Sequence, residues 1–424
     1  MKKTMLLGTA LSAAAVLGLA NFASAAGTPP NIYFSTRAQG AGVETICYLY
    51  GGGDGATVCD ATYGSYDSTH GVLTLKAGIS GKPNGRVGVE NIDGITITAD
   101  SDIETNLRVY GGSEVDLTLD FGNYTFTDAL YKYSDAAEGV YSGFGGDALV
   151  IKSGVFNNMQ LFTGSLDIQG GTINIRPGLT MGVAGSEFIK ISGGEINIPG
   201  ASMAFSSGGD ISITGGKINA TDIEDVGFDV GGDLKITGGK VNLKSAATPA
   251  GFGVGLFGDK SFTIDDGELT IDGFKWGIDG ANSKIYFNGG VTTIKNSTTH
   301  TIWIDPAADP EHDIVFGEGM GIKEDTYVFW DDEKGTGKSV GIAESGTVTI
   351  AKGYPVRWHY GWEDVNEEDG DDDVKAPDTG RLSIENGGAM MAMVSLGVLA
   401  MIASGAYVAA YVAKRKQAKV KFNK

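Results

Sequence analysis

The chain has few of the residues and motifs on which most catalytic sites depend. Its 424 residues include two cysteines and four histidines, and the histidines are scattered. The metalloprotease pattern H-E-x-x-H, paired C-x-x-C motifs and a phosphate-binding loop are missing. The sequence therefore lacks the usual signatures of zinc enzymes and P-loop enzymes, and it nominates no catalytic residue.

Proline and positive charge are also scarce. The chain has 10 prolines against 67 glycines, and 32 basic against 52 acidic residues, so its formal net charge is −20 at pH 7. Because such a charge repels nucleic acids, we expect no nucleic-acid partner. An apolar content of 42% argues against disorder. The glycine excess, without collagen's strict period, suits a β-structure rich in turns.

A repeat of about 22 to 23 residues between Ser165 and Asp305 dominates the sequence. Each unit reads as a strand of alternating apolar residues, a tight glycine turn and a second such strand. The turns fall at Gly170, Gly193, Gly215, Gly238, Asp266 and Gly289. A fixed period of this size indicates units that stack into a solenoid.

A third apolar patch follows each turn, as in VGFDV at Val226 and VGLF at Val254. Three strands in each unit predict an all-β fold, a right-handed single-stranded parallel β-helix with three faces and about 22–23 residues per coil. A meander of antiparallel hairpins is the alternative, because Gly-Gly between alternating strands is also a hairpin signal. In a meander of hairpins, however, the third apolar patch of each unit would have no strand position.

The first 25 residues have the layout of a secretory signal peptide. Lys2 and Lys3 precede an apolar stretch, and the segment ends in Ala-Ser-Ala. We expect cleavage between Ala25 and Ala26 and export of the remaining chain. An uncleaved membrane anchor is the alternative.

Residues 389–412 are expected to form a C-terminal transmembrane helix. They carry no charge and are long enough to cross about 30 Å of hydrocarbon. The tail that follows contains six basic residues, a pattern that keeps this end in the cytoplasm and the body of the protein outside.

Before this apolar segment stands the pentapeptide Ala376, Pro377, Asp378, Thr379 and Gly380. Together with the apolar span and the basic tail, it resembles the sorting signal of sortase-processed surface proteins of Gram-positive-type bacteria. The motif of that family is L-P-x-T-G, and Ala376 stands in the place of its leucine. The resemblance implies that a sortase cleaves between Thr379 and Gly380 and joins the Thr379 carboxyl group to a cell-wall precursor. The protein would then be extracellular, anchored in the cell wall or retained in the membrane by the C-terminal helix.

These features predict the organisation of the chain. The expected parts are a signal peptide (1–25), an N-terminal β cap (26–90), the parallel β-helix (91–352), a C-terminal cap with an acidic linker (353–375), the sorting motif (376–380), the transmembrane helix (389–412) and a basic cytoplasmic tail (413–424). Within the linker, eight acidic residues repel one another and keep it extended.

Cys47 and Cys59 are the only cysteines, and a glycine-rich turn separates them. In an exported protein this spacing favours a disulfide that staples the N-terminal cap. A pair of free thiols or a metal site is the alternative.

The units GGDISITGGKINA and GGDLKITGGKVNL resemble the secreted carbohydrate-binding β-helix domains first described from cellulolytic bacteria. The resemblance implies binding of acidic or cellulosic polysaccharide, with calcium at carboxylates near the corners of the coils. The candidate calcium ligands are Asp229, Asp265, Asp266 and Asp279. An acidic outer surface without metal is the alternative.

Trp276 and Trp303 occupy the third patch of two successive units. On an outer face, their rings would stack on the apolar faces of sugars. The alternative is that both rings point inward and fill the core.

We therefore predict an extracellular, surface-anchored binding or adhesion protein that recognises polysaccharide or a cell surface. One alternative is a calcium-dependent polysaccharide lyase or hydrolase on the same fold, since such enzymes use paired carboxylates. A passive structural coat protein is the third hypothesis.

Overall fold

The structure is a computed structural model in which parts of residues 30–360 are described. The described ranges are 30–37, 44–82, 85–90, 92, 94–110, 116–128, 148–247, 252–280, 283–304, 314–324, 327–330, 340–342, 346–356 and 359–360. They belong to one compact unit, Ser24–Tyr133 with Val140–Trp362. The predicted signal cleavage site, sorting motif, transmembrane segment and basic tail lie outside the described residues.

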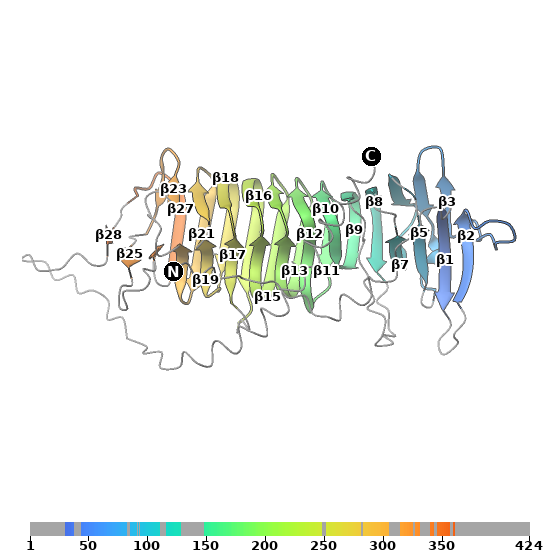
Figure 1. Ribbon diagram of the computed structural model, residues 1–424, viewed down its shortest axis with the longest axis horizontal. Helices are drawn as coiled ribbons and strands as arrows, with labels where there is room; N and C mark the ends of the chain where they lie inside the picture. Colours follow the sequence, from blue (N-terminus) through green and yellow to red (C-terminus); the bar gives the residue numbers. More distant parts are fainter. Residues whose placement is uncertain are drawn as a thin grey trace, which may run out of the picture. The chain divides into compact units, whose positions relative to one another are not determined.

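The N-terminal strands precede the regular repeats (Figure 1). They are β1 (Asn31–Arg37), β2 (Glu44–Tyr50), β3 (Gly64–Asp67), β4 (Val72–Leu75), β5 (Arg86–Glu90), β6 (Ile95–Ala99), β7 (Ile103–Tyr110) and β8 (Asp116–Asp128), with the 3-10 helix η1 (Ala77–Ile79) after β4. β1 pairs antiparallel with β2 and β5. From β4 onward, β6 and β8 add in parallel.

Cys47 and Cys59 form a disulfide bond in this N-terminal region. Cys47 lies in β2, and Cys59 follows an isolated parallel bridge between Tyr48 and Val58. The glycine-rich turn between the cysteines therefore does not close an antiparallel hairpin. Both sulfur atoms belong to side chains that lie in or against the hydrophobic core.

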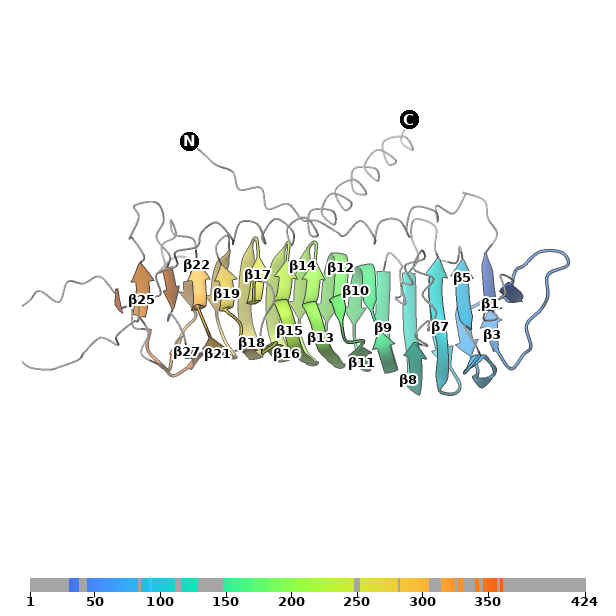
Figure 2. The ribbon, with the colours of Figure 1, turned by 90° about the horizontal axis from the view of Figure 1, so that it is seen from below.

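The repeats form strands β9 to β22, which stand side by side in Figures 1 and 2. Their bounds are β9 (Ala148–Met159), β10 (Leu161–Ile168), β11 (Thr172–Ile175), β12 (Leu179–Ile191), β13 (Glu195–Ser207), β14 (Asp210–Ile213), β15 (Lys217–Val230), β16 (Asp233–Ser245), β17 (Val254–Gly258), β18 (Ser261–Asp272), β19 (Trp276–Gly280), β20 (Lys284–Phe287), β21 (Val291–Ser297) and β22 (His300–Ile304).

Each repeat unit pairs in parallel with the next, one period along the chain. Ile189 pairs with Ile211, Ile211 with Leu234, and Leu234 with Phe262. These steps of 22, 23 and 28 residues are the spacings of the successive turns at Gly193, Gly215, Gly238 and Asp266. The turns thus set the register between units.

Glycine is required at these turns because of both backbone conformation and space. Gly239 has a φ of +82°, and a Cβ added there would lie 2.8 Å from the Gly215 carbonyl group of the preceding unit. Residues with a side chain avoid this left-handed conformation, and backbone atoms cannot move aside. Stacked turns of this kind therefore tolerate only glycine.

Inward side chains of successive units stack into one hydrophobic core. Phe205 and Phe228 are fully buried, and their rings stack with centroids 4.7 Å apart. Ile196, Ile218 and Val241 form a second column of register partners, each 0% exposed. Burial of this apolar surface, at about 25 cal/mol per Å², is the main term that stabilises the repeats.

The C-terminal strands depart from the repeat. They are β23 (Ile314–Phe316), β24 (Met320–Ile322), β25 (Tyr327–Trp330), β26 (Val340–Ile342), β27 (Gly346–Lys352) and β28 (His359–Tyr360). β23 still adds in parallel to β20. β27 then runs antiparallel to β21 and β24, and β26 runs antiparallel to β22 and β25.

The fold prediction is wrong as it was stated. The described residues form an all-β structure whose parallel strands close around the core, and within residues 91–352 the antiparallel pairs made by β26 and β27 replace the uniform winding of a right-handed single-stranded β-helix. Among the described residues, the last turn that stacks on a repeat is at Gly317, which lies against the Asn288 backbone; beyond it the repeat no longer sets the register, and β26 and β27 pair with the last repeat strands in the opposite direction.

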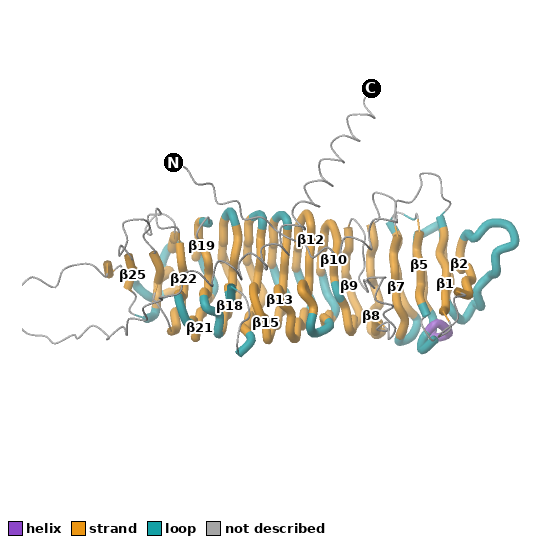
Figure 3. Tube along the Cα trace, turned by 60° about the horizontal axis from the view of Figure 1, so that its bottom comes forward, coloured by secondary structure: helices purple, strands orange, loops and turns teal. Residues whose placement is uncertain are grey.

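The predicted C-terminal transmembrane helix is also not part of the observed fold. Strands dominate the structure, and η1 is the helix marked in Figure 3. Across the described ranges, no helix has the length and apolarity needed to cross a bilayer. The apolar segment 389–412, on which that prediction rested, lies outside those ranges.

Candidate functional site

A row of outward-facing side chains crosses the third strand of five successive units. We call it the outer row: Ser206, Asp229, Phe257, Asp279 and Trp303, which lie in β13, β15, β17, β19 and β22. Each residue is the direct register partner of the next. Paired strands lie about 4.8 Å apart, so the row is a continuous array; β17, β19 and β22 are neighbours in Figure 2.

The core determines which way the outer row points. The residues that precede it along each strand, such as Phe228, Leu256 and Ile278, are 0% exposed. Since consecutive strand residues point to opposite faces, the next residue in each strand faces outward. Four members of the row are partly exposed, whereas Asp279 is only 7% exposed.

Trp276 and Trp303 lie at one end of this array and pack against each other. Their ring centroids are 6.4 Å apart, and the rings are nearly parallel, with an interplanar angle of 22°. Both side chains are partly exposed and neither belongs to the buried core. The Trp276 Nε1–H is buried and meets no acceptor in the part of the chain that the structure describes.

The carboxyl group of Asp229 is held in a poorly solvated, electronegative position. Its pKa is raised from 3.8 to about 6, chiefly by burial; the hydrogen bond from Ser206 lowers the pKa, and the carboxylates of Asp259 and Asp225 contribute to the rise. Ser206 Oγ donates to Asp229 Oδ2 over 3.4 Å. Burial also raises the pKa of Asp225. Two carboxyl groups on β15 thus bind their protons more tightly than free aspartate.

The raised pKa of Asp229 predicts a pH-dependent effect of Asp229→Asn on stability. As the pH falls below 3.8, the carboxyl becomes protonated in the unfolded as well as the folded chain, so its cost disappears. Above about pH 6 the folded chain must hold a desolvated carboxylate, a cost of about 2 kcal/mol after allowance for partial exposure. We therefore expect urea titrations to show the variant more stable than the unsubstituted protein at pH 7.5 and equally stable at pH 3.5.

Asp222→Asn is the matched control, because it removes the same charge from the same strand. Asp222 is exposed and has a φ of +55°, a conformation that asparagine also tolerates. Its substitution should change stability equally at the two pH values. A gain for Asp229→Asn that does not depend on pH would contradict the electrostatic explanation.

The four predicted calcium ligands do not come together. Asp265 accepts a hydrogen bond from Asn288 and pairs with Lys235 Nζ at 3.0 Å. The Asn288 hydrogen bond, and to a smaller extent Lys235, lower the pKa of the Asp265 carboxyl. Asp266 accepts from the Gly267 backbone N–H. Among the described residues, no group of three or more acidic, histidine or cysteine side chains is placed to hold a metal ion. Calcium binding therefore stays a prediction without a ligand cluster.

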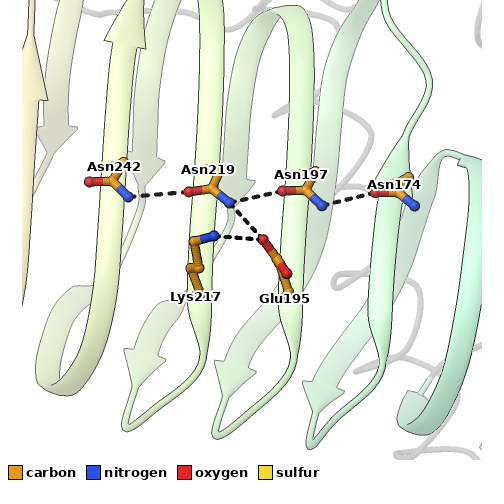
Figure 4. Close-up of polar contacts among 6 residues, drawn as sticks. All are labelled: Asn174, Glu195, Asn197, Lys217, Asn219 and Asn242. Atoms are coloured by element: carbon orange, nitrogen blue, oxygen red, sulfur yellow. Dashed lines mark hydrogen bonds and ion pairs between the residues drawn. The ribbon is translucent and has the colours of Figure 1, made fainter.

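A ladder of asparagine amides covers the outer face of the second strands (Figure 4). Asn197 donates to Asn174, Asn219 to Asn197, and Asn242 to Asn219, over 2.9, 2.9 and 3.2 Å. Beside the ladder, Lys217 pairs with Glu195 at 2.8 Å and lowers the pKa of its carboxyl. Because the amides bond to one another, we assign this face a structural role.

The outer row was only partly visible in the sequence. Asp229, Asp279, Trp276 and Trp303 were singled out there, but as members of two separate hypotheses, a metal site and an aromatic ladder. Ser206 and Phe257 were missed. Aligning the third patches on their buried residues, Phe228 with Leu256 and Ile278, would have placed Phe257 between the two aspartates.

Comparisons with known proteins identify a family but no individual relative. No curated protein and no solved structure matches the chain. A family model described as "Carbohydrate-binding domain-containing protein" matches residues 79–300, which is more than half of the 424 residues. The match covers the repeats up to residue 300, including Trp276 and every residue of the outer row except Trp303. The chain belongs to the family of carbohydrate-binding domain-containing proteins.

Proposed function

We propose that the protein binds polysaccharide, without catalysing a reaction on it, through the outer row together with Trp276. The observation that carries this proposal is the pair of stacked, partly exposed tryptophans at the end of the outer row. Flat aromatic rings bind the apolar C–H faces of sugars. Carboxylate and hydroxyl oxygens, such as those of Asp229 and Ser206, accept hydrogen bonds from sugar hydroxyl groups.

Two further observations support binding over hydrolysis. Membership of the carbohydrate-binding family is the first. The second is that Phe257 stands between Asp229 and Asp279 in the row. A glycosidase needs its two carboxyl groups to face the scissile bond from opposite sides, and here a phenyl ring occupies the position between them.

The experiment is a glycan array followed by calorimetry on the best-bound oligosaccharide. Trp303→Ala should lower the affinity at least tenfold and leave the melting temperature almost unchanged, because Trp303 is partly exposed and outside the core. Phe188→Ala is the matched control, since Phe188 is an aromatic residue, 42% exposed, on the first strand of a unit. Unchanged glycan binding by Trp303→Ala, together with a lower melting temperature, would refute the proposal.

We also propose that the protein is displayed outside the cell and attached to the wall. The support is the signal-peptide layout at the N-terminus and the pentapeptide Ala-Pro-Asp-Thr-Gly that ends at Gly380. Mass spectrometry of wall digests should find a peptide that ends at Thr379 and is linked to a wall fragment. Recovery of peptides that span Thr379 and Gly380 from the mature protein would exclude this attachment.

A further inference from the structure

The outer row continues beyond Ser206 toward the first repeats. Ser206 is the register partner of Ala184 on β12, and Ala184 is the partner of Phe162 on β10. Leu161, which precedes Phe162, is 0% exposed, so Phe162 faces outward like the rest of the row. The aligned positions therefore run from Phe162 to Trp303, and we call them the extended row.

Aromatic rings are the prominent side chains of the extended row. Phe162 is 44% exposed, and Phe257 and Trp303 are partly exposed. Asp279, between the last two rings, is only 7% exposed, and Ala184, next to Phe162, is 5% exposed, so neither offers much surface to a ligand. Single exposed phenylalanines are common on protein surfaces. Phe162 differs from such residues because it shares one register line with two rings of the proposed site.

The three rings are separated by even numbers of strands. Phe162 lies four register steps from Phe257, and Phe257 lies two steps from Trp303. At about 4.8 Å per step, the extended row is about 29 Å long. In an extended chain of β-1,4-linked sugars, each sugar is about as long as one step and is turned over relative to the sugar before it. Every second sugar presents the same face, so the three rings would meet equivalent faces of such a chain.

The direction of the extended row also favours a straight ligand. Register partners lie on a line that crosses the strands, and β10, β12, β17, β19 and β22 follow one another along one edge of the stack in Figure 2. A straight polysaccharide laid along this line contacts all three rings. A chain that winds into a helix, as α-1,4-linked glucose does, would meet one ring and then turn away from the next.

We propose that Phe162 is a further sugar-binding residue, and that the extended row takes an extended, linear polysaccharide that crosses the strands from Trp303 to Phe162. A chain much shorter than the row can contact only one of these two ends. This assignment rests on the proposed function, and it adds a residue and a required ligand length to the same site.

The test is calorimetry with trimers and hexamers of β-1,4-linked xylose, mannose and glucose, and with maltohexaose as the α-1,4-linked counterpart of the glucose hexamer. At least one β-1,4-linked hexamer should bind at least fivefold more tightly than its trimer, because only the hexamer is long enough to reach both Trp303 and Phe162. Maltohexaose should bind more weakly than that hexamer.

Substitutions then locate the length dependence at Phe162. Phe162→Ala should lower the affinity for the hexamer about fivefold, the scale of one aromatic stacking contact, and change that for the trimer less than twofold. Phe162→Tyr, which keeps a ring, should retain the hexamer affinity. Trp303→Ala should weaken the binding of trimer and hexamer alike.

Phe188→Ala is the matched control for Phe162→Ala. Phe188 is a phenylalanine of similar exposure, 42%, and it lies on the first strand of its unit, outside the extended row. Its substitution should leave the affinities for trimer and hexamer unchanged. Thermal unfolding followed by circular dichroism establishes that each variant is folded.

The outcomes separate this inference from the function on which it rests. If Phe162→Ala weakens trimer and hexamer equally, or weakens neither, the assignment of Phe162 is overturned while carbohydrate binding stands. Equal affinities of trimers and hexamers, or tightest binding of maltohexaose, overturn the extended ligand. The inference also falls alone if the array finds a ligand but no β-1,4-linked oligomer binds. If no glycan binds at all, the proposed function falls with it.

Discussion

Phe228→Ala should lower the free energy of unfolding by about 3 to 5 kcal/mol, the usual cost of truncating a buried phenylalanine. Phe228 is 0% exposed, and its ring stacks on Phe205 at 4.7 Å with an interplanar angle of only 9°. The neighbouring units are fixed by stacked glycine turns, so they cannot collapse into the cavity that alanine would leave. Urea denaturation followed by circular dichroism measures the change.

Phe188→Ala is the control for this prediction, because it removes the same ring from a surface position. Phe188 is 42% exposed, and surface substitutions of this kind usually change stability by less than about 1 kcal/mol. If the two variants were equally destabilised, the stacked phenylalanines would not be the main support of this part of the core.

Replacement of both cysteines by serine should destabilise the N-terminal region by about 3 kcal/mol in the chain-entropy model. The disulfide between Cys47 and Cys59 closes a loop over a sequence separation of 12 residues. Without it, the unfolded chain gains conformational freedom, which favours unfolding. Thermal unfolding of the double variant, followed by circular dichroism, measures the change.

Reduction provides the control for the disulfide. Dithiothreitol should lower the unfolding temperature of the unsubstituted protein to that of the double-serine variant, and it should leave the variant unchanged. A variant as stable as the oxidised protein would show that the packing of Cys59 and its neighbours, rather than the covalent bond, holds the cap together.

The regular part of the fold was predictable because its information is local and repeated. The turns at Gly193, Gly215 and Gly238 carry the same two-residue signal, and the strands on either side alternate in the same phase. The ends were not predictable in this way. The direction of β27 depends on how it meets β21 across more than 50 residues of chain, and no short-range pattern specifies such a pairing.

The candidate site was less predictable than the repeats. Sequence alternation does not settle whether Trp276 points inward, because the third strands place two consecutive residues, such as Gly277 and Ile278, in buried positions. This local irregularity shifts the alternation of inward-facing and outward-facing side chains by one residue along the strand. Only the pairing of Asp279 with Trp303 and Phe257 shows which side chains share the outer face.

The asparagine ladder has a consequence for how such a protein changes length. Asn197, Asn219 and Asn242 occupy equivalent places and make the same bond to the neighbour before them. Excision of one whole period would bring Asn242 against Asn197 with donor and acceptor still matched. Gene duplication or loss of single units can therefore lengthen or shorten the array without any new contact having to evolve.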